Sequence, residues 1–252
     1  MGAPKIGWEN FFRTGTVSAS SEASGFEKEN AYDWNTYDYW SPTDVTNEWI
    51  KVDMGTAQAA DYFAVAAHNL NDYSGSIKCQ YSSDDFASDV HDASTLITPA
   101  DNAPFFEEFT SVSARYWRLL INSTTTAPRL GCISLGTALE MDRAVGAGFA
   151  IPFDARNDMV INQRSEGGQF LGRSVIRKGV STSMTFTLQT LAFVRGDWRN
   201  FLDHAQLYPW FFTWNPTYGD ALLLWLEGDP TPPVYNTHTL LNVGVTVRGL
   251  RN

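Results

Sequence analysis

The chain has 252 residues, of which 43% are hydrophobic and 18% charged, and its mean hydropathy is -0.24. This length fits two modest domains or one large all-β domain, and the composition excludes wholesale disorder. No apolar run approaches the roughly 18 residues of a membrane span. The first seven residues lack the apolar stretch of a secretion signal, so we expect the mature chain to begin here.

Charge is distributed unevenly along the chain. Residues 1–140 hold 19 acidic and 8 basic side chains, whereas residues 141–252 hold 9 acidic and 10 basic ones. An acidic first half argues against binding to phosphate backbones, which requires clustered Lys and Arg. The two cysteines, Cys79 and Cys132, are too few for a disulfide scaffold and are not spaced as a metal site. We expect buried free thiols, with a disulfide between them as the alternative.

Short strands separated by turns dominate the first half. Residues 48–55 alternate apolar and polar side chains and end on Gly55, as in a half-buried strand. Residues 61–67 are more continuously apolar, which predicts a strand covered on both faces. Two further strands are predicted over residues 76–82 and 114–121. With short connections and no helical stripe between the strands, the predicted architecture is a β-sandwich or jelly roll.

Five short blocks in this half follow one another in the order seen in discoidin domains, the coagulation factor 5/8 type C family. They are Ser18–Glu22, Asn30–Asp33 with Tyr39–Ser41, Glu48–Gly55, Tyr81–Asp84 and Ala114–Leu119. Residues 8–140 thus resemble a discoidin domain, which implies a β-sandwich domain over residues 1–140 that binds carbohydrate or braces its neighbours. Two departures stand out. Met54 occupies a place where the family more often has Leu, and the cysteines do not lie at the domain's ends, where extracellular members often have a disulfide.

The second half, predicted as a domain of residues 141–252, combines strands with one helix. Gly167-Gly168, between residues 158–165 and 169–176, predicts a hairpin. Two strands have one apolar face each, formed by Met184, Phe186 and Leu188 in the first and by Leu241, Val243, Val245 and Val247 in the second. Between these strands an amphipathic helix is predicted, capped by Asp197 and followed by Pro209, with an apolar stripe of Trp198, Phe201, Leu202 and Ala205.

This order of elements, with an aromatic strand at residues 208–216 and a last strand ending in Arg248-Gly249, resembles bacteriophage tail proteins of the distal-tail and minor-tail group. The resemblance covers residues 145–252 and is one of pattern. It implies a tail-tube-like β-sandwich with one flanking α-helix, which assembles as a hexamer or trimer into a ring around the channel through which DNA leaves. The predicted fold class is therefore mainly β in both halves.

No set of residues indicates a catalytic site. The four histidines are scattered, and the chain lacks His-Glu-x-x-His, Gly-x-Ser-x-Gly and phosphate-binding glycine motifs. The acidic pairs Asp84-Asp85 and Glu107-Glu108 could supply the two carboxylates of a glycosidase. Neighbouring residues on a strand point to opposite faces, however, which favours solvated loops or strand edges for both pairs. We therefore expect a protein that is not an enzyme.

The densest chemical feature is the segment of residues 32–40. Its aromatic residues Trp34, Tyr37, Tyr39 and Trp40 are interleaved with Asp33, Asn35 and Asp38. Flat apolar rings beside hydrogen-bonding groups suit a pyranose ring. The candidate carbohydrate site comprises Trp34, Tyr37, Asp33 and Asp38, whereas the discoidin resemblance assigns Trp40 to the core. The alternative is that all these aromatic residues belong to a core or an interface.

The same resemblance implies binding or structural roles for two further groups of residues. Arg115 and Arg118 could donate hydrogen bonds to a sugar, but the family pattern makes one of them a structural ion-pair partner. Some discoidin domains hold Ca²⁺, and Asp33, Asp38 and Asp44 offer oxygen ligands. Because no full ligand set is visible, we expect no cofactor, with structural calcium as the alternative.

The aromatic block after the helix has two interpretations. Trp210, Phe211, Phe212 and Trp214 could insert into a membrane, or they could face a neighbouring subunit, since obligate interfaces are rich in such residues. No cationic amphipathic face accompanies them. We therefore predict a subunit interface and no membrane insertion.

Together these expectations describe a structural protein of a phage tail tip, present in the virion and assembled in the host cytoplasm. Its second domain would form a homo-oligomeric ring and contact other tail proteins such as tube, hub and fibre, and DNA would pass through without specific binding. Its first domain would point outward to host cell-surface glycan or brace neighbouring tail proteins. The alternative is a stand-alone soluble carbohydrate-binding protein that is not part of a virion.

Overall fold

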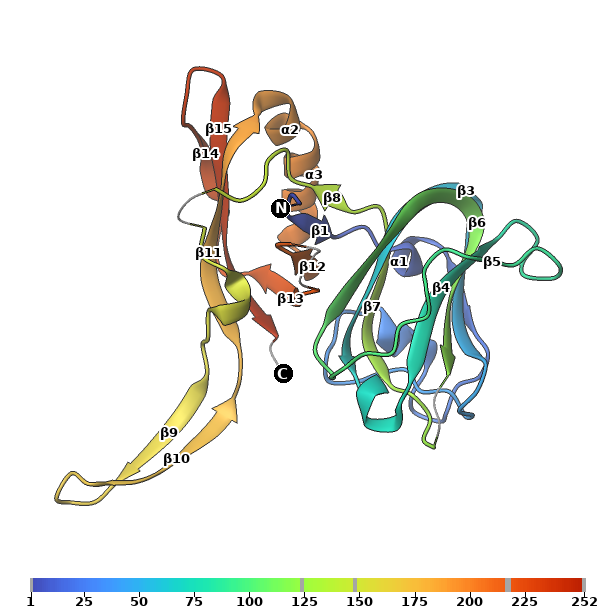
Figure 1. Ribbon diagram of the computed structural model, residues 1–252, viewed down its shortest axis with the longest axis horizontal. Coiled ribbons are helices and arrows are strands. Elements are labelled where there is room, and N and C mark those ends of the chain that lie inside the picture. Colours follow the sequence, from blue (N-terminus) through green and yellow to red (C-terminus); the bar gives the residue numbers. More distant parts are fainter. Residues whose placement is uncertain (1, 123–124, 147–148, 216–218, 251–252) are drawn as a thin grey trace.

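The protein folds into two β-rich units that lie side by side (Figure 1). The computed structural model describes residues 2–122, 125–146, 149–215 and 219–250. We call residues 9–138 the first unit, and residues 2–8 together with residues 139–250 the second unit. Among the described residues, no helix is both long enough and apolar enough to cross a membrane.

The first unit is a curled antiparallel sandwich. Its elements are α1 (Phe11–Thr14), β2 (Thr16–Ala19), η1 (Lys28–Ala31), β3 (Glu48–His68), η2 (Leu70–Tyr73), β4 (Ser76–Ser82), β5 (His91–Asp92), β6 (Phe105–Asn122) and β7 (Leu130–Gly136). The strands pair in the order β2-β3-β6-β4-β5, and β7 pairs with β3. Side chains such as Ile50, Trp117 and Leu119 fill the core between the layers. The predicted β-sandwich is confirmed.

The strands predicted in the first unit are confirmed, but two of them are parts of one long strand. β3 contains both residues 48–55 and residues 61–67, and its pairing with β6 is interrupted between Asp53 and Gln58. Gly55, with φ +72°, lies at this interruption. β2 pairs with the segment before it and β7 with the segment after it. The bend therefore lets β3 contribute to both layers.

The second unit is a β-sheet covered by helices. Its elements are β1 (Lys5–Gly7), β8 (Leu139–Glu140), η3 (Pro152–Asp154), β9 (Met159–Arg164), β10 (Phe170–Arg177), β11 (Val180–Thr190), α2 (Leu191–Arg195), α3 (Asp197–Ala205), β12 (Trp210–Thr213), β13 (Ala221–Leu226), β14 (Thr231–Tyr235) and β15 (Leu240–Leu250). The main sheet has the order β11-β15-β13-β12-β1-β8, with β14 paired to β15. Trp198, Phe201 and Ala205 of α3 are buried in the core that the sheet forms with the helices.

Most of the elements predicted here are confirmed, with local corrections. Leu188 does not continue the apolar face of β11: a bulge lies between Phe186 and Gln189, Leu188 has φ +62° and is 38% exposed, and Gln189 is buried instead. The N-cap of α3 is Gly196, and Asp197 is the first helical residue. A short helix, α2, directly precedes α3, with Gly196 between them. Residue 216, the last of the predicted aromatic strand, lies outside the described residues.

The N-terminal strand belongs to the second unit. β1 pairs with β12 on one side and with β8 on the other. The first unit is therefore inserted between two neighbouring strands of the second unit's sheet, and the predicted boundary at residue 140 is displaced. A strand as short as β1 carries too little periodicity to be assigned to a sheet from sequence.

The two units share a buried cluster where they meet. Trp34, Tyr62, Ala64, Ala66 and Cys132 of the first unit pack there against Phe211 and Leu223 of the second. We call these seven residues the junction cluster. Together with the two chain connections at β1 and β8, it fixes the first unit against the main sheet.

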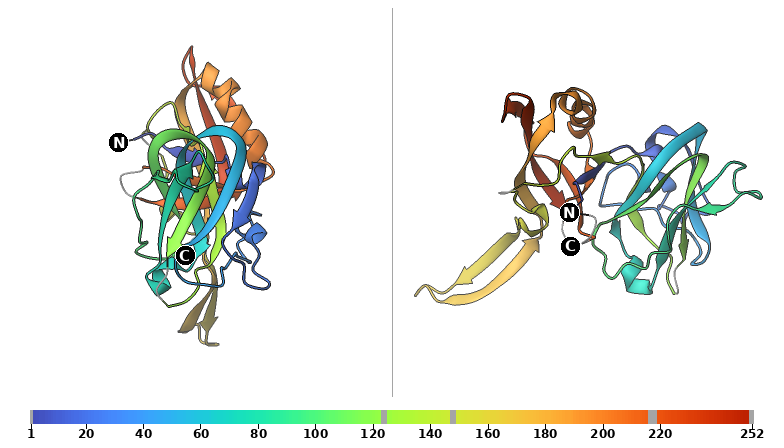
Figure 2. Two further views of the ribbon diagram at one scale, coloured as in Figure 1. Left: turned by 90° about the vertical axis from the view of Figure 1, so that its right-hand side faces the viewer. Right: turned by 45° about the horizontal axis from the view of Figure 1, so that its top comes forward.

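A two-stranded ribbon stands apart from both cores. β9 and β10 pair with each other in a sheet of their own, and they project from the edge of the main sheet at β11 (Figures 1 and 2). The turn between them contains Gly168 at φ +79°, as the Gly-Gly pair predicts. We call residues 156–178 the arm.

Candidate functional site

The loop of residues 32–40 is built from side chains that bond to its own backbone. The Asn35 N–H donates to Asp33 Oδ1 at 2.8 Å, and the Tyr37 N–H donates to Asn35 Oδ1 at 3.0 Å. Such turns are typical of Asp and Asn. They present Tyr37 to solvent with 90% of its surface exposed. Tyr37 therefore offers a free aromatic ring, as the sequence predicts.

Trp34 lies elsewhere. It is 8% exposed, and its ring centroid lies 6.3 Å from that of Phe211 and 6.2 Å from that of His204 in the second unit. A ring enclosed by the junction cluster has no face left for a sugar, so the expectation that Trp34 faces a ligand is wrong. Trp40, in contrast, is fully buried and donates from Nε1 to the Ser21 carbonyl at 3.0 Å, which confirms its place in the core.

The two carboxylates of this loop differ in exposure. Asp33 is exposed, although partial burial raises its pKa, an effect to which the nearby Asp38 adds. Asp38 is half-buried, and its Oδ1 has no hydrogen-bond partner among the described residues. Among those residues no three His, Cys, Asp or Glu side chains form a group that could hold a metal ion. Asp33, Asp38 and Asp44 do not form such a group, and structural calcium stays an untested alternative.

A second aromatic feature lies at Tyr39, which sequence reasoning did not select. Its ring stacks on Phe26, with centroids 4.6 Å apart and 12° between the planes, and the Arg129 guanidinium lies 4.8 Å from the Tyr39 centroid. The backbone N–H of Arg129 donates a hydrogen bond to Asn69 Oδ1 at 2.8 Å. This arrangement combines an aromatic stack, a cation and an amide. We call Tyr37, Tyr39, Phe26 and Arg129 the loop surface.

The two arginines of β6 have different partners. Arg115 forms a bidentate ion pair with Asp53, at 2.7 and 2.8 Å, which confirms that one of the two is structural. Hydrogen bonds from Arg115 hold the pKa of Asp53 at about 2. Arg118 donates from Nε to Gln80 at 2.8 Å, with its guanidinium 4.1 Å from the Phe86 centroid. Both arginines thus have partners within the first unit.

The Asp53 ion pair predicts an acid-dependent loss of stability. Because the folded pKa of about 2 lies below the usual 3.8, the pair stabilises the fold above pH 4, and this contribution is lost as the pH falls toward 2. We expect Asp53→Asn to cost less than about 1 kcal/mol at pH 7, as for exposed pairs. Thermal melts from pH 7 to pH 2 test this: the two proteins should differ at pH 7 and converge at pH 2. A constant difference would contradict it.

The remaining acidic pairs serve the fold. Asp84 accepts hydrogen bonds within its own turn, which lower its pKa, and Asp85 pairs with Lys51 at 2.5 Å. Glu108 pairs with Lys5 at 2.6 Å, while burial raises the pKa of Glu107. Asp84 and Asp85 lie in the turn after β4, as the solvated-loop interpretation predicts, whereas Glu107 and Glu108 lie on β6, where neighbouring side chains point to opposite faces.

The two cysteines are buried free thiols, as predicted. Burial raises the pKa of both, that of Cys132 to about 12, so neither is a reactive thiolate at neutral pH.

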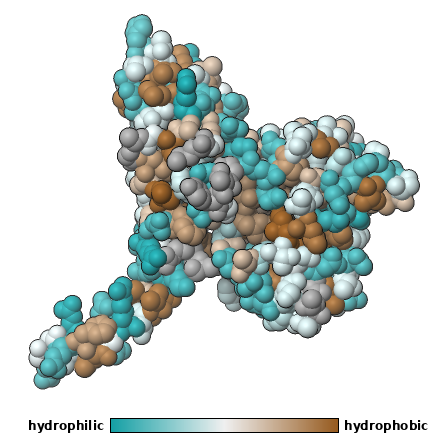
Figure 3. All heavy atoms as spheres, viewed as in Figure 1, coloured by the Kyte–Doolittle hydropathy of each residue, from teal (hydrophilic) through white to brown (hydrophobic). Residues whose placement is uncertain are grey.

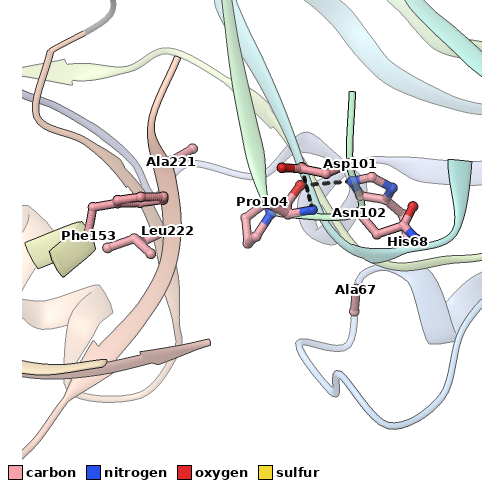
Figure 4. A pocket seen from close by; sticks show the side chains of 9 residues that line it. Ala67, His68, Asp101, Asn102, Pro104, Phe153, Ala221 and Leu222 are labelled. Atoms are coloured by element: carbon pink, nitrogen blue, oxygen red, sulfur yellow. Dashed lines mark hydrogen bonds between the residues drawn. The ribbon is translucent and has the colours of Figure 1, made fainter. Parts of the chain in front are cut away.

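A cleft of about 440 Å³ lies between the two units (Figure 4). Phe153 and Leu222 line one side, and His68, Asp101 and Pro104 line the other. His68 Nε2 contacts the Ala103 carbonyl at 3.0 Å and its Nδ1 accepts from the Leu70 N–H at 3.3 Å, while burial lowers its pKa. Because both ring nitrogens are engaged, this neutral histidine is not available as a general base.

The aromatic block assigned to a subunit interface is inside the molecule. Trp210 and Phe211 are fully buried, Phe212 is 1% exposed, and half-buried Trp214 donates from Nε1 to Asp220 at 3.2 Å. β12 pairs with β1 and β13 along its two edges, and its faces are covered by the second unit's core, which contains Trp210 and Phe212, and by the junction cluster, which contains Phe211. The predicted subunit seam at these four residues is therefore wrong. A buried core strand and a subunit interface are both rich in aromatic residues, so the sequence could not distinguish between them.

Comparisons with known proteins agree with the architecture of the first unit. Residues 16–134 match the model of the F5/8 type C domain. No curated protein matches the chain. Among solved structures, chitosan-binding module 1 of a chitosanase/glucanase from Paenibacillus sp. IK-5 is 23% identical, with 50% of this chain and 98% of that one covered and a TM-score of 0.43.

Two further solved structures are similar over the same part of the chain. A CBM32 module from Clostridium perfringens, in complex with GalNAc-β-1,3-galactose, is 15% identical over 49% of this chain and 96% of that one, with a TM-score of 0.42. The CBM32 of AlyQ, in complex with 4,5-unsaturated mannuronic acid, is 23% identical over 48% of this chain and 92% of that one, with a TM-score of 0.40. The match to the F5/8 type C model shows that residues 16–134 are discoidin-like.

Proposed function

We propose that the protein is a structural component of a phage tail tip whose F5/8 type C domain contacts glycan on the host surface. The observation that carries the glycan proposal is Tyr37, a ring 90% exposed on a loop that its own Asp and Asn side chains hold in place. A pyranose would stack on this ring, with the Asp33 carboxylate beside it as a hydrogen-bond acceptor. The loop surface supplies Arg129 as a donor.

Repeated copies would make such a shallow site effective. One aromatic stack adds only about 0.5–1.5 kcal/mol beyond burial, so a single site binds weakly. Several sites on one assembly raise avidity about 10²–10⁴-fold when they engage together. In this proposal the second unit forms the homo-oligomeric ring and contacts other tail proteins, DNA passes through without specific binding, and the first unit points outward. The proposed homo-oligomeric ring is supported by the resemblance of residues 145–252 to tail proteins and by the exposed arm. The aromatic block does not support it, because that block is buried.

The glycan proposal predicts a specific effect of Tyr37→Ala. Loss of one stack should weaken binding about 2- to 12-fold per site, without a change in melting temperature, because the ring contacts solvent. Binding is measured on an immobilised glycan panel that includes chitotriose and GalNAc-β-1,3-galactose. Tyr235→Ala is the matched control, since Tyr235 is 59% exposed in the second unit. Equal losses in both variants, or no loss for Tyr37→Ala, would contradict the site.

A stand-alone soluble carbohydrate-binding protein is the second candidate function. It is favoured by the burial of Trp210, Phe211 and Phe212 within a single chain, which leaves the second unit's core complete without a partner. Light scattering on the purified protein and electron microscopy of virions distinguish the two. A monomer at about 100 μM that is absent from any virion would favour the stand-alone protein, whereas rings at the tail tip would favour the structural role.

A further inference from the structure

The arm exposes apolar side chains on both of its faces. Val160 lies opposite Val175, and Ile161 lies opposite Ser174, so the two valines and Ile161 point to opposite sides of the ribbon. Figure 3 shows apolar residues along the arm's visible face. Six of its large apolar residues are 49–68% exposed, namely Met159, Ile161, Phe170, Leu171, Val175 and Ile176. A two-stranded ribbon is only marginally stable by itself in water, and exposed apolar surface of this kind marks an interaction site.

The charge of the arm identifies its partner chemically. Residues 156–178 hold five basic and two acidic side chains, whereas the rest of the chain holds 13 basic and 26 acidic ones. The arm is thus a basic and apolar element on an acidic protein. A second copy of this chain offers the complementary charge.

The complementary surface lies where β8 meets α3. A hollow of about 360 Å³ is lined there by the acidic side chains of Glu9, Glu140 and Asp197 and by the half-buried apolar side chains of Trp8 and Leu139. We call it the acidic hollow. It combines carboxylates with apolar walls, as the arm combines guanidinium groups with apolar side chains.

The carboxylates in and beside the acidic hollow outnumber the cation that contacts them, Lys5. Lys5 contacts Glu108 at 2.6 Å and Glu140 at 3.7 Å. Burial raises the pKa of Glu9 and of Asp61, and the charge of Asp61 adds to the shift of Glu9. An added guanidinium would therefore be favoured here.

Within one molecule the arm and the acidic hollow lie at opposite ends of the main sheet. The arm leaves the sheet at β11, the first strand of the order, and the hollow borders β8, the last. The arm also projects away from β1 and β8 (Figures 1 and 2). A contact between them must therefore join two molecules, head to tail. Such a heterologous contact closes into a ring or continues as a filament.

We propose that the arm of one copy docks on the acidic hollow of a second copy. The proposal deepens, and rests on, the homo-oligomeric assembly proposed above. It names the contact that the buried aromatic block cannot make.

A charge exchange in the full chain tests the pairing. The arm variant is Arg164→Glu with Arg173→Glu. The hollow variant is Glu140→Lys with Asn200→Lys, since Asn200 also lines the acidic hollow, and all four side chains are exposed. Each variant should raise the dissociation constant of the oligomer at least tenfold in sedimentation equilibrium. The variant that combines all four changes should recover at least half of the wild-type association, because the arm is then acidic and the hollow carries added lysines. Arg143→Glu with Arg195→Glu is the matched control, with the same charge change off the arm.

Each outcome decides for or against the pairing. Loss in both variants with recovery in the combined one supports it. A wild type that is monomeric at about 100 μM, an arm variant that associates normally, or no recovery in the combined variant would overturn it. If wild type bound duplex DNA and the arm variant lost only that binding, a nucleic acid would be the arm's partner and the proposal would fail. Absence of glycan binding, with arm-dependent association intact, would refute only the glycan proposal.

Discussion

Replacing Trp210 with alanine is expected to lower the free energy of unfolding by about 3–5 kcal/mol, the range for large aromatic residues in a core. Trp210 is fully buried, and its ring meets Phe201 of α3 edge to face, with centroids 5.0 Å apart and planes at 86°. Removing it opens a cavity between the helix and the sheet. If Trp210 were part of a subunit seam, the same change would dissociate an oligomer and leave the single chain as stable as before.

Urea unfolding at low protein concentration measures this difference. Trp225→Ala serves as the control, because Trp225 lies on the neighbouring strand β13 but is 38% exposed, and it should cost much less. If Trp210→Ala unfolded as the wild type does but lost association, the result would support a subunit interface at Trp210 and contradict the burial of β12 within one chain.

The elements with strong local periodicity were predictable from sequence. In β15, Leu241, Val243, Val245 and Val247 are all buried, as their alternation requires. The i, i+3, i+4, i+7 spacing in α3 and the Gly-Gly turn of the arm likewise carry their structure in a few neighbouring residues. Local patterns suffice where one face of an element is buried and the other is not.

Features that depend on distant residues were not predictable. Leu188 leaves the apolar face of β11 because of a bulge, which shifts the alternation by one residue. β1 finds its partners β8 and β12 more than 130 residues away. The sequence around Trp210 reads equally as a core strand or as an interface, since both bury aromatic side chains. What separates these cases is which surfaces meet, and no single segment contains that information.

In the candidate site, too, local features were predictable from sequence and long-range contacts were not. Tyr37 is exposed as expected, because the Asp and Asn residues before it form turns that keep the loop at the surface. Trp34, three residues earlier, is buried by strands of the second unit. Arg129 contacts Tyr39 although the two are 90 residues apart in the sequence, and no local motif predicts this contact. Composition thus identified the right loop but could not say which ring faces outward.

Trp34→Ala should destabilise the protein by about 3–5 kcal/mol and uncouple the two units. Trp34 has φ 72°, a backbone conformation that costs a bulky residue roughly 1–2 kcal/mol, so its packing must offset that strain. Calorimetry should show one transition for the wild type and two for Trp34→Ala, because the junction cluster joins the cores. Trp34→Phe should cost less, since Nε1 has no hydrogen-bond partner among the described residues and the change removes no bond. Tyr37→Ala, on the same loop, should melt as the wild type does. A single unshifted transition in Trp34→Ala would mean that the junction cluster does not couple the units.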